Sequence, residues 1–313
     1  MQALVTRSYG PLEELAVADL PAPVPGPGQV LVRAEAAALN PADLKLVTGG
    51  MRPAGLTHPF VPGIDVTGTV TAVGEGVTRY APGDPVLAWN GVRSGALAEL
   101  VLVDDGPFST RRPAGLPARE AAALPTAALT AAALIEAAGL SPGLRVLVVG
   151  AAGGIGSFVV QLAKHAGARV IATGRAGDEG FLHTLGADDV LDYTRDDVAA
   201  QVAKLTEADG KTGADVVIDL ARAGDALMLS ADAARTGGLL VSPLGGPASF
   251  PRDVRAAYTG TAAAPHRLGG LAAQAAEGRL RVPIAAAYPF SEARQALIDF
   301  AGHHYQGKVT ITF

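Results

Sequence analysis

The sequence predicts an α/β protein with two domains, one a β-rich, barrel-like domain and the other a doubly wound parallel sheet. The first 120 residues contain short apolar or alternating stretches separated by glycine and proline. After residue 120, strand-like and helix-like stretches alternate. The 313 residues, of which 49% are hydrophobic, suffice for two buried cores.

The first domain is predicted from regularly spaced short strands, which are typical of a barrel. We expect strands at Gln29–Ala34, Val66–Ala72 and Pro85–Trp89. Between them lie the turn-forming stretches PAPVPGPG, GEG and PGDP, at residues 21–28, 74–76 and 82–85.

The second domain is predicted from strands that alternate with helices, the pattern of a parallel sheet. It opens with a helical stretch, Ala118–Ala138, interrupted near Pro125. We expect strands at Arg145–Val149, Arg169–Thr173, Asp189–Leu191, Asp215–Leu220 and Leu239–Ser242. We expect helices at Ile155–Ala166, Gly177–Leu185, Asp196–Leu205 and Asp225–Ala234.

The last fifty residues are expected to return to the first domain. They contain a helix at Leu268–Glu277, a strand-like Leu280–Ile284, a helix at Ser291–Phe300 and a final alternating VTITF. We therefore place the first domain at residues 1–120, completed by 263–313, and the second at residues 121–262.

Composition limits the possible partners and location. The chain has no cysteine, which excludes disulfides and thiolate metal sites. Its net charge is −5, so nothing indicates nucleic acid or an anionic membrane as a partner. The N-terminal stretch lacks the apolar core of a signal peptide, and we expect a cytoplasmic protein.

A glycine-rich turn between a predicted strand and a predicted helix indicates a dinucleotide site. The stretch GAAGGIG, residues 150–156, matches G-x-G-x-x-G with Ala151 in place of the first glycine. A side chain at Gly153 would block a pyrophosphate at the helix N-terminus, and Gly156 lets the helix pack against the strand. We therefore expect Ala152, Gly153, Gly154 and Ile155 to bind the cofactor.

The end of the second strand of this domain predicts which cofactor binds. A carboxylate there binds the ribose 2′-hydroxyl of NAD, but this chain has Gly174 followed by Arg175. Arg175 is suited to a 2′-phosphate, which predicts NADPH. The alternative is an ordinary solvated arginine, and the nearby Asp178 weakens the NADPH prediction.

Several segments together resemble the zinc-free quinone oxidoreductase (zeta-crystallin-like) branch of the medium-chain dehydrogenase/reductase superfamily. These segments are GQVLVRAEAAALNPADLKLVTG (28–49), HPFVPGIDVTGTVTAVGEGVTRYAPGDPV (58–86), PTAALTAAALI (125–135), GAAGGIGSFVVQLAKHAGA (150–168) and QGKVTITF (306–313). The resemblance covers essentially the full length.

The resemblance implies a GroES-like barrel with an inserted Rossmann domain, and cofactor and substrate in the cleft. It implies hydride transfer from NADPH to a quinone or an α,β-unsaturated carbonyl. Zinc-dependent relatives carry Gly-His-Glu where this chain has Gly63-Ile64-Asp65, and they need cysteine ligands. No metal is therefore expected.

The resemblance also assigns roles to individual residues. Asn40 would bind the nicotinamide or the substrate oxygen, unless it only forms the turn before Pro41. Lys45 would bind the cofactor ribose or an enolate oxygen, unless it is simply solvated. Asn40 and Lys45 are the expected catalytic residues.

Further cofactor-binding residues are implied on both domains. Thr130, with Thr126 as a neighbouring candidate, would lie beside the nicotinamide, unless its hydroxyl only bonds its own helix. Tyr193 would lie near the adenosine phosphate, and Lys308 near the cleft. The loop Pro243, Leu244 and Gly245 would bind the nicotinamide carboxamide through its backbone.

The sequence is also compatible with two other functions. An enoyl-thioester reductase and an NADPH-binding regulatory or structural protein with little turnover are the alternatives. The resemblance also implies a homodimer formed through the second domain, in which Leu239–Ser242 lies near the strand that extends the sheet across a two-fold axis.

Overall fold

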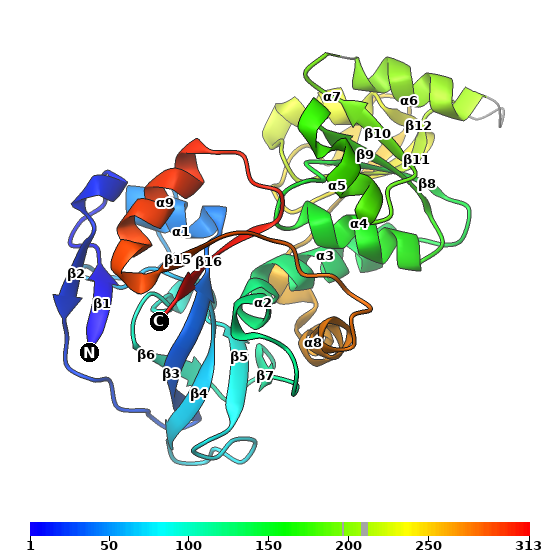
Figure 1. The fold of residues 1–313 in the computed structure, drawn as a ribbon. Helices are drawn as coiled ribbons and strands as arrows, with labels where there is room; N and C mark the ends of the chain where they lie inside the picture. The colour runs from blue at the N-terminus through cyan, green and yellow to red at the C-terminus, as the bar shows by residue number, and fades with distance from the viewer. Residues whose placement is uncertain (196, 208–211) are drawn as a thin grey trace. The chain divides into compact units, whose positions relative to one another are not determined.

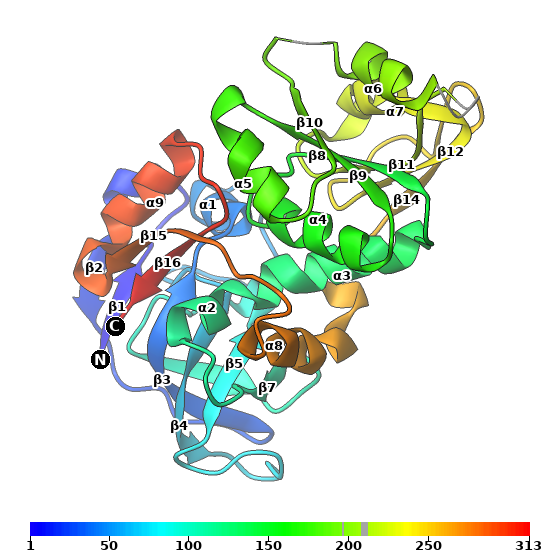
Figure 2. The same ribbon diagram turned by 45° about the vertical axis from the view of Figure 1, so that its right-hand side comes forward.

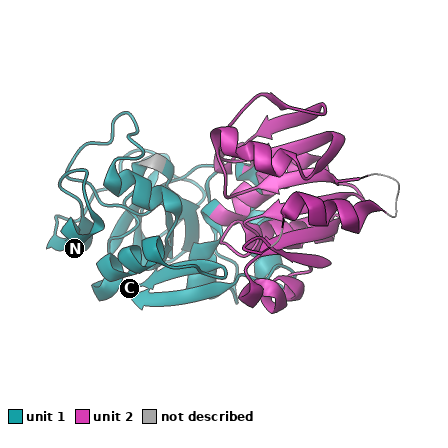
Figure 3. Ribbon diagram, turned by 90° about the horizontal axis from the view of Figure 1, so that it is seen from above, with its two compact units in different colours: residues 1–126, 265–313 teal, residues 127–264 magenta. Residues whose placement is uncertain are grey.

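The computed structural model describes residues 1–195, 197–207 and 212–313 of the chain. They form two compact units, shown in Figure 3. Unit 1 comprises Met1–Thr126 and Pro265–Phe313, and unit 2 comprises Ala127–Ala264. These bounds lie within a few residues of the domain limits expected from the sequence.

Unit 1 is built on the long strand β3 (Gln29–Ala38). The sheet has the order β15-β16-β3-β4-β5-β7, and β6 pairs with β3 beside this path. The partners are β4 (Asp65–Val73), β5 (Pro85–Trp89), β6 (Leu100–Asp104) and β7 (Ser109–Arg111). The strands expected in this part of the sequence are confirmed, and a small ribbon of β1 (Gln2–Val5) and β2 (Ala16–Asp19) adds to them.

The C-terminal segment returns to unit 1, as expected. Strand β16 (Lys308–Thr312) pairs antiparallel with β3, and Figure 1 shows the two side by side. Helix α9 (Ala293–Gly302) packs against β15 (Ile284–Pro289) and β16, and its residues Ala296 and Leu297 are part of the core.

The expected strand at Leu280–Ile284 is wrong, because β15 begins only at Ile284. Helix α8 (Leu268–Ala276) ends just before this stretch, and the Leu280 amide donates to the Gln274 carbonyl. The Leu280 side chain is buried. The apolar Leu280 side chain is therefore buried beside the end of α8 and does not belong to a strand.

Unit 2 is a mainly parallel sheet with helices on both faces, which confirms the doubly wound fold. Its order is β10-β9-β8-β11-β12-β14-β13. The parallel strands are β8 (Arg145–Val149), β9 (Arg169–Gly174), β10 (Asp189–Asp192), β11 (Ala214–Asp219), β12 (Ala234–Ser242) and β14 (Val254–Tyr258), and β13 (Ser249–Phe250) is antiparallel.

Alternating strand residues supply the apolar surface for each layer of helices. Leu147 and Val149 join a core cluster with α6 (Val198–Thr206) and α7 (Met228–Ala231). Figures 1 and 2 show α4 (Gly156–His165) and α5 (Glu179–Thr184) on the opposite face. A strand covered on both faces is apolar throughout, as RVLVV at residues 145–149 is.

Two helix predictions in unit 2 need correction. The helix expected at Asp225–Ala234 is a short 3-10 turn, Gly224–Leu227, followed by α7, and it ends before Ala234. Ala234 instead pairs with Ala214 at the start of β12. The helix expected from Asp196 begins at Val198, where the Asp197 carboxylate accepts from the Ala200 amide; Asp196 itself lies outside the described residues.

The remaining helices lie at the predicted positions. The stretch Ala118–Ala138 forms α2 (Ala118–Ala123) and α3 (Pro125–Ala138), with the break at the predicted proline. Proline cannot donate a backbone hydrogen bond, so it begins the new helix at its first position. Among the described residues, no helix has the length and apolarity needed to cross a bilayer.

A buried ion network ties the amino ends of three unit 2 strands together. The Arg145 guanidinium donates to Asp215 Oδ2 at 3.0 Å, and Arg235 Nε donates to Asp215 Oδ1 at 2.7 Å. The Arg145 amide also donates to Asp215. Despite burial, these arginine donors lower the pKa of Asp215 to about 2.

Replacing Asp215 with alanine should destabilise the protein by about 3 kcal/mol, because it leaves the buried Arg145 without its carboxylate. Urea unfolding measures this loss. Glu277→Ala, which removes an exposed ion pair with Arg279, is the control and should change little. Equal small losses in both variants would contradict the assignment.

The same carboxylate predicts how stability depends on pH. The pKa of Asp215 in the folded state lies below its value in an unfolded chain, about 3.9. Its contribution is therefore present above pH 4 and is lost as the pH falls toward 2. The difference between the wild type and Asp215→Ala should shrink over that window.

Candidate functional site

The predicted cofactor residues of unit 2 lie at one edge of its sheet. Strands β8, β9, β10 and β12 run parallel, so their carboxyl ends meet at the same edge. The glycine-rich turn follows β8, Arg175 follows β9, Tyr193 follows β10, and Pro243 follows β12. The topology thus brings together residues that are nearly one hundred positions apart in the sequence.

The glycine-rich turn leaves room for a ligand at Gly153 and none at Gly156. A Cβ at Gly153 would meet only the Gly150 carbonyl oxygen, at 3.5 Å, which is ordinary van der Waals contact. A Cβ at Gly156 would lie 2.2 Å from that oxygen. Glycine is therefore needed at the two positions for different reasons. Gly153 leaves space for a ligand to approach the turn, and Gly156 allows α4 to pack closely on the turn.

Backbone donors are available at the same turn. Among the described residues, the amides of Gly154 and Ile155 donate to no backbone carbonyl, and both residues are half-buried. Ala152 is nearly covered, at 3% exposure. Amides at the N-terminus of the ten-residue helix α4 suit a pyrophosphate, so the turn fits a dinucleotide.

Arg175 and Tyr193 form a pair at the ends of β9 and β10. Arg175 Nε donates to Tyr193 Oη at 3.0 Å, and the Tyr193 amide donates to the Gly174 carbonyl at 3.2 Å. Both side chains are exposed. The guanidinium is thus held at the sheet edge through its Nε, on an exposed side chain.

Asp178, whose charge weakens the NADPH prediction, is buried in the turn after Arg175. It is 2% exposed, and its Oδ2 accepts from the Arg175 amide at 2.8 Å. Gly174 also has a packing reason, because a Cβ there would lie 2.8 Å from Asp178 Cβ and 2.9 Å from Leu182. An acidic side chain at residue 174 would therefore not fit this turn.

The loop after β12 and Thr130 are held by hydrogen bonds within unit 2. The Gly245 carbonyl accepts from the Gly224 amide, and the Leu244 amide donates to Ser242 Oγ, which fixes the loop after β12. Thr130 is buried, and its hydroxyl lies 2.7 Å from that of Thr261. This contact leaves both the cofactor role of Thr130 and a bond to its own helix as predictions.

In unit 1, Asn40 lies at the centre of a buried polar cluster. It begins helix α1 (Pro41–Thr48), and its backbone amide donates to Asp43 Oδ2 at 2.8 Å. Its Nδ2 donates to Asp65 Oδ2 at 2.9 Å and to the Ala38 carbonyl at 3.2 Å. Its Oδ1 accepts from Lys308 Nζ at 2.6 Å.

Asp65 connects this cluster to helix α3. The Thr126 amide and hydroxyl donate to Asp65 Oδ1 at 3.0 and 2.7 Å. The carboxylate therefore caps the N-terminus of a 14-residue helix, where a negative charge is favoured. The predicted cofactor residue Thr126 has its hydroxyl directed at this carboxylate.

Lys308 is enclosed by the same cluster. Its Nζ donates to the Leu39 carbonyl at 2.8 Å and lies 3.8 Å from Asp65 Oδ2, and the residue is 3% exposed. Burial lowers the pKa of Lys308 and raises that of Asp65, and their mutual attraction opposes both shifts. The cofactor role expected for Lys308 remains a prediction, because this ammonium faces inward.

Asp43 is the second buried carboxyl group of the cluster. It is fully buried, and its Oδ1 has no hydrogen-bond partner among the described residues. Burial, with a smaller contribution from the Asp65 charge, raises the pKa of Asp43 to about 7. Sequence analysis did not single out Asp43, although its place three residues after Asn40, at the start of a helix, was a visible signal.

Lys45 lies apart from these hydrogen bonds. It is exposed on α1, two residues beyond Asp43, and no described hydrogen bond or ion pair of its ammonium joins it to the cluster. Both its expected catalytic role and its alternative as a solvated lysine are compatible with that position.

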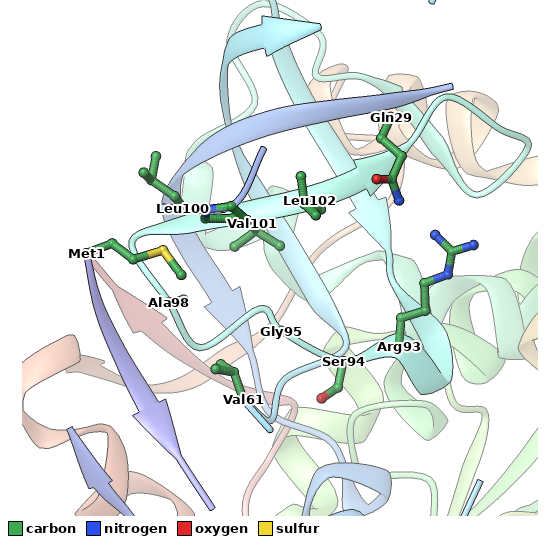
Figure 4. Close-up of a pocket in the computed structure, with 11 residues that line it drawn as sticks. Met1, Gln29, Val61, Arg93, Ser94, Gly95, Ala98, Leu100, Val101 and Leu102 are labelled. Atoms are coloured by element: carbon green, nitrogen blue, oxygen red, sulfur yellow. The ribbon is translucent and has the colours of Figure 1, made fainter. Parts of the chain in front are cut away.

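A separate hollow lies on unit 1, lined by strand β6 and the segment before it. Figure 4 shows Met1, Val61, Arg93 and Leu100 around it. Its lining is largely apolar, and Arg93 is paired with Asp104. None of the residues predicted for catalysis or cofactor binding lines this hollow, so it is not the candidate site.

The fold and the turn after β8 define a protein class, the two-domain dehydrogenases with a GroES-like unit and a Rossmann unit. Residues 26–108 match the family model "Alcohol dehydrogenase GroES-like domain", and residues 154–249 match "Zinc-binding dehydrogenase". A solved NAD-dependent alcohol dehydrogenase is 32% identical with a TM-score of 0.88, and the match covers 100% of both chains. The chain belongs to the medium-chain dehydrogenase/reductase superfamily.

Relatives confirm the expected quinone oxidoreductase branch. A chloroplast envelope quinone oxidoreductase homolog of Arabidopsis thaliana is 41% identical over 64% of this chain and 63% of its own length. A chloroplastic NADPH-dependent alkenal/one oxidoreductase of the same organism is 35% identical over 63% of this chain and 54% of its own. The chain thus spans a little over half of each of these relatives.

The solved relatives include one described as NAD-dependent and one described as complexed with NADPH. Beside the NAD-dependent alcohol dehydrogenase, a mycobacterial protein complexed with NADPH is 29% identical with a TM-score of 0.86, and the match covers 100% of both chains. The family therefore supports a nicotinamide cofactor for this chain.

The two glycines of the turn predict opposite effects of the same substitution. Gly153→Ala should fold normally and weaken binding of the cofactor, because its methyl group points into the open space at the turn. Gly156→Ala should lower the melting temperature, because its methyl group meets backbone atoms. Calorimetric titration with NADPH and thermal unfolding measure the two effects, and a destabilised Gly153→Ala that binds normally would contradict this reading.

Proposed function

We propose that this protein is an NADPH-dependent reductase that transfers a hydride to a quinone or to the β-carbon of an α,β-unsaturated carbonyl. The observation that supports it most is the pairing of an open glycine-rich turn with Arg175 at one edge of the unit 2 sheet. Relatives described as quinone and alkenal/one oxidoreductases support the substrate class.

The residues of unit 2 fit the parts of the cofactor in turn. The amides of Gly154 and Ile155 would bind the pyrophosphate, and Arg175 beside Tyr193 would bind the 2′-phosphate. When bound, NADPH supplies the hydride. The loop of Pro243, Leu244 and Gly245 would hold the carboxamide through backbone groups.

The chemistry of Asn40 is constrained by the bonds it already makes. Both hydrogens of its Nδ2 are directed at Asp65 and Ala38, so Asn40 has no further donor. Any contact to a ligand would pass through Oδ1 and would need a hydroxyl or amide donor. A substrate carbonyl oxygen is therefore a poor partner for Asn40, and a cofactor hydroxyl or carboxamide is a suitable one.

Zinc independence is part of this proposal. The chain has no cysteine to serve as a ligand. Asp65, at the position of the expected departure from Gly-His-Glu, is engaged by Asn40 and Thr126 and lies 3.8 Å from an ammonium group. A positive charge at that distance opposes binding of a second cation.

The deciding experiment is consumption of NADPH with a panel of quinones, small enones and enoyl thioesters, with and without a chelator. We expect turnover with quinones or enones that the chelator leaves unchanged. Preference for enoyl thioesters would support the alternative enoyl-thioester reductase. Tight NADPH binding without any turnover would support a regulatory or structural role, and restoration of activity by zinc would contradict zinc independence.

We also propose a cytoplasmic location, which cell fractionation tests.

We further propose a homodimer joined through unit 2. Strand β12, which includes Leu239–Ser242, is paired on both sides by β11 and β14. On the side of β14 away from β12, β13 pairs with Val254 and Arg255, and no described strand pairs with residues 256–258 on that side. This edge is the one through which the sheet could extend into a second copy. Light scattering should give twice the chain mass, and a monomer at micromolar concentration would refute the dimer.

Replacing Arg175 with alanine should raise the Michaelis constant for NADPH about tenfold, because a charge-assisted bond to the 2′-phosphate is lost. The constant for NADH should change little. The effect should weaken at high salt, since Arg175 is exposed. Arg195→Ala, two residues after Tyr193, is the matched control. Equal use of both cofactors by the wild type would contradict the role of Arg175.

A further inference from the structure

The most informative group outside the cofactor site is the ion pair that encloses the Asn40 side chain. The carboxamide lies between Asp65, which accepts from Nδ2, and Lys308, which donates to Oδ1. Asp65 is 0% exposed, and Asn40 and Lys308 are each 3% exposed. Three elements contribute to this arrangement: β4, the start of α1, and β16.

The charges of the pair determine the direction of the carboxamide. A lysine ammonium can only donate hydrogen bonds, and an ionised carboxylate can only accept them. Turning the amide by 180° would place its NH₂ against the ammonium and its oxygen against the carboxylate. Both contacts would then be repulsive in a site that excludes water, so only one orientation is compatible with the pair.

The stability of the fold alone does not account for this pair. Removing a lysine and an aspartate from water costs much of what their attraction returns, and apolar replacements are often neutral or stabilising. Unit 1 already has an extensive apolar core that includes residues of β3, β4 and β16. The geometry points to a role in orientation.

We propose that Asp65 and Lys308 are positioning residues of the reductase reaction, which act by fixing the direction of the Asn40 carboxamide. The inference rests on the proposed function and deepens it. Asn40 contacts the cofactor through Oδ1, whereas Asp65 and Lys308 contact neither cofactor nor substrate. This assignment replaces a direct cofactor contact by Lys308 with an indirect effect.

Asp43 makes the arrangement sensitive to pH. It faces the pair from α1, and the charged groups that act on it are Asp65 from β4 and Lys308 from β16. The ammonium lowers the pKa of Asp43 from the higher value that burial and Asp65 would give. Ionised Asp43 adds a second negative charge near Lys308 and competes with Asp65 for it, so turnover should decrease as Asp43 loses its proton.

A double-mutant cycle tests whether Lys308 acts through Asn40. Lys308→Met should lower kcat about tenfold or more, since misplacing a binding group by 1 Å can cost that much. The dissociation constant for NADPH should rise no more than it does in Asn40→Ala. The double variant Asn40→Ala/Lys308→Met should be no slower than Asn40→Ala alone. Lys164→Met, which removes an exposed pair with Asp188, is the control and should retain the wild-type kcat.

Several results would overturn the proposal. Additive losses in kcat would show that Lys308 acts independently of Asn40. A dissociation constant for NADPH that rises well beyond the Asn40→Ala value would show that Lys308 contacts the cofactor. If Lys308→Met fails to fold, Asp65→Asn/Lys308→Met removes both charges of the pair, so neither remains buried without the other. It should show the same low kcat, and wild-type kcat in that variant would refute the proposal.

The pH profile separates positioning from a structural role. In Lys308→Met no ammonium remains for Asp43 and Asp65 to compete for, so the decrease of kcat at alkaline pH should disappear. A decrease of kcat in Lys308→Met at the same alkaline pH as in the wild type would contradict the coupling. Lys164→Met should leave the profile unchanged.

A measurement without cofactor distinguishes failure of this inference from failure of the proposed function. The side-chain amide protons of Asn40, assigned by their loss in Asn40→Ala, should give distinct, slowly exchanging NMR signals in the wild type. They should shift and exchange faster in Lys308→Met. Unchanged signals would refute the positioning role even if the enzyme reduces quinones, and changed signals would support it even if no tested substrate is turned over.

Discussion

A buried carboxylate needs hydrogen-bond donors, and unit 1 is arranged so that Asp65 finds them on segments far apart in the chain. It accepts from Asn40 before α1 and from Thr126 at the start of α3, and it faces Lys308 on the last strand. Leaving any of these polar groups unpaired would cost more than each bond contributes. The entry to α1, the start of α3 and the return of the C-terminal strand are therefore linked by one side chain.

In unit 2 the corresponding constraint is the common direction of the strands. Parallel pairing from β10 through β14 places every connecting loop that follows a strand at the same edge. For that reason the glycine-rich turn and the Arg175–Tyr193 pair lie at the same edge of the sheet, where both can serve one cofactor. The opposite edge carries the Arg145–Asp215 network, which ties the strands together where no ligand needs to enter. Binding and stability are thus assigned to opposite ends of the same strands.

The glycines show how one residue type serves different physical needs. Gly156 is required by the backbone of its own turn, whereas Gly153 borders open space. Gly174 was interpreted from the sequence as the absence of a carboxylate that would select NAD. The structure adds a packing reason, since Asp178 and Leu182 occupy the space that a side chain would need. The two explanations are compatible, because the same crowding excludes an acidic residue.

The sequence by itself determined the two-unit architecture, most strands and the dinucleotide turn, because hydrophobic periodicity and glycine spacing are local properties. It also indicated Asn40, Arg175 and Tyr193. Only the tertiary structure decided that Asp43 and Asp65 surround Asn40, and that Lys308 faces inward. These side chains lie up to 268 positions apart. Their hydrogen-bond partners and burial depend on strand pairing, which no local pattern in the sequence contains.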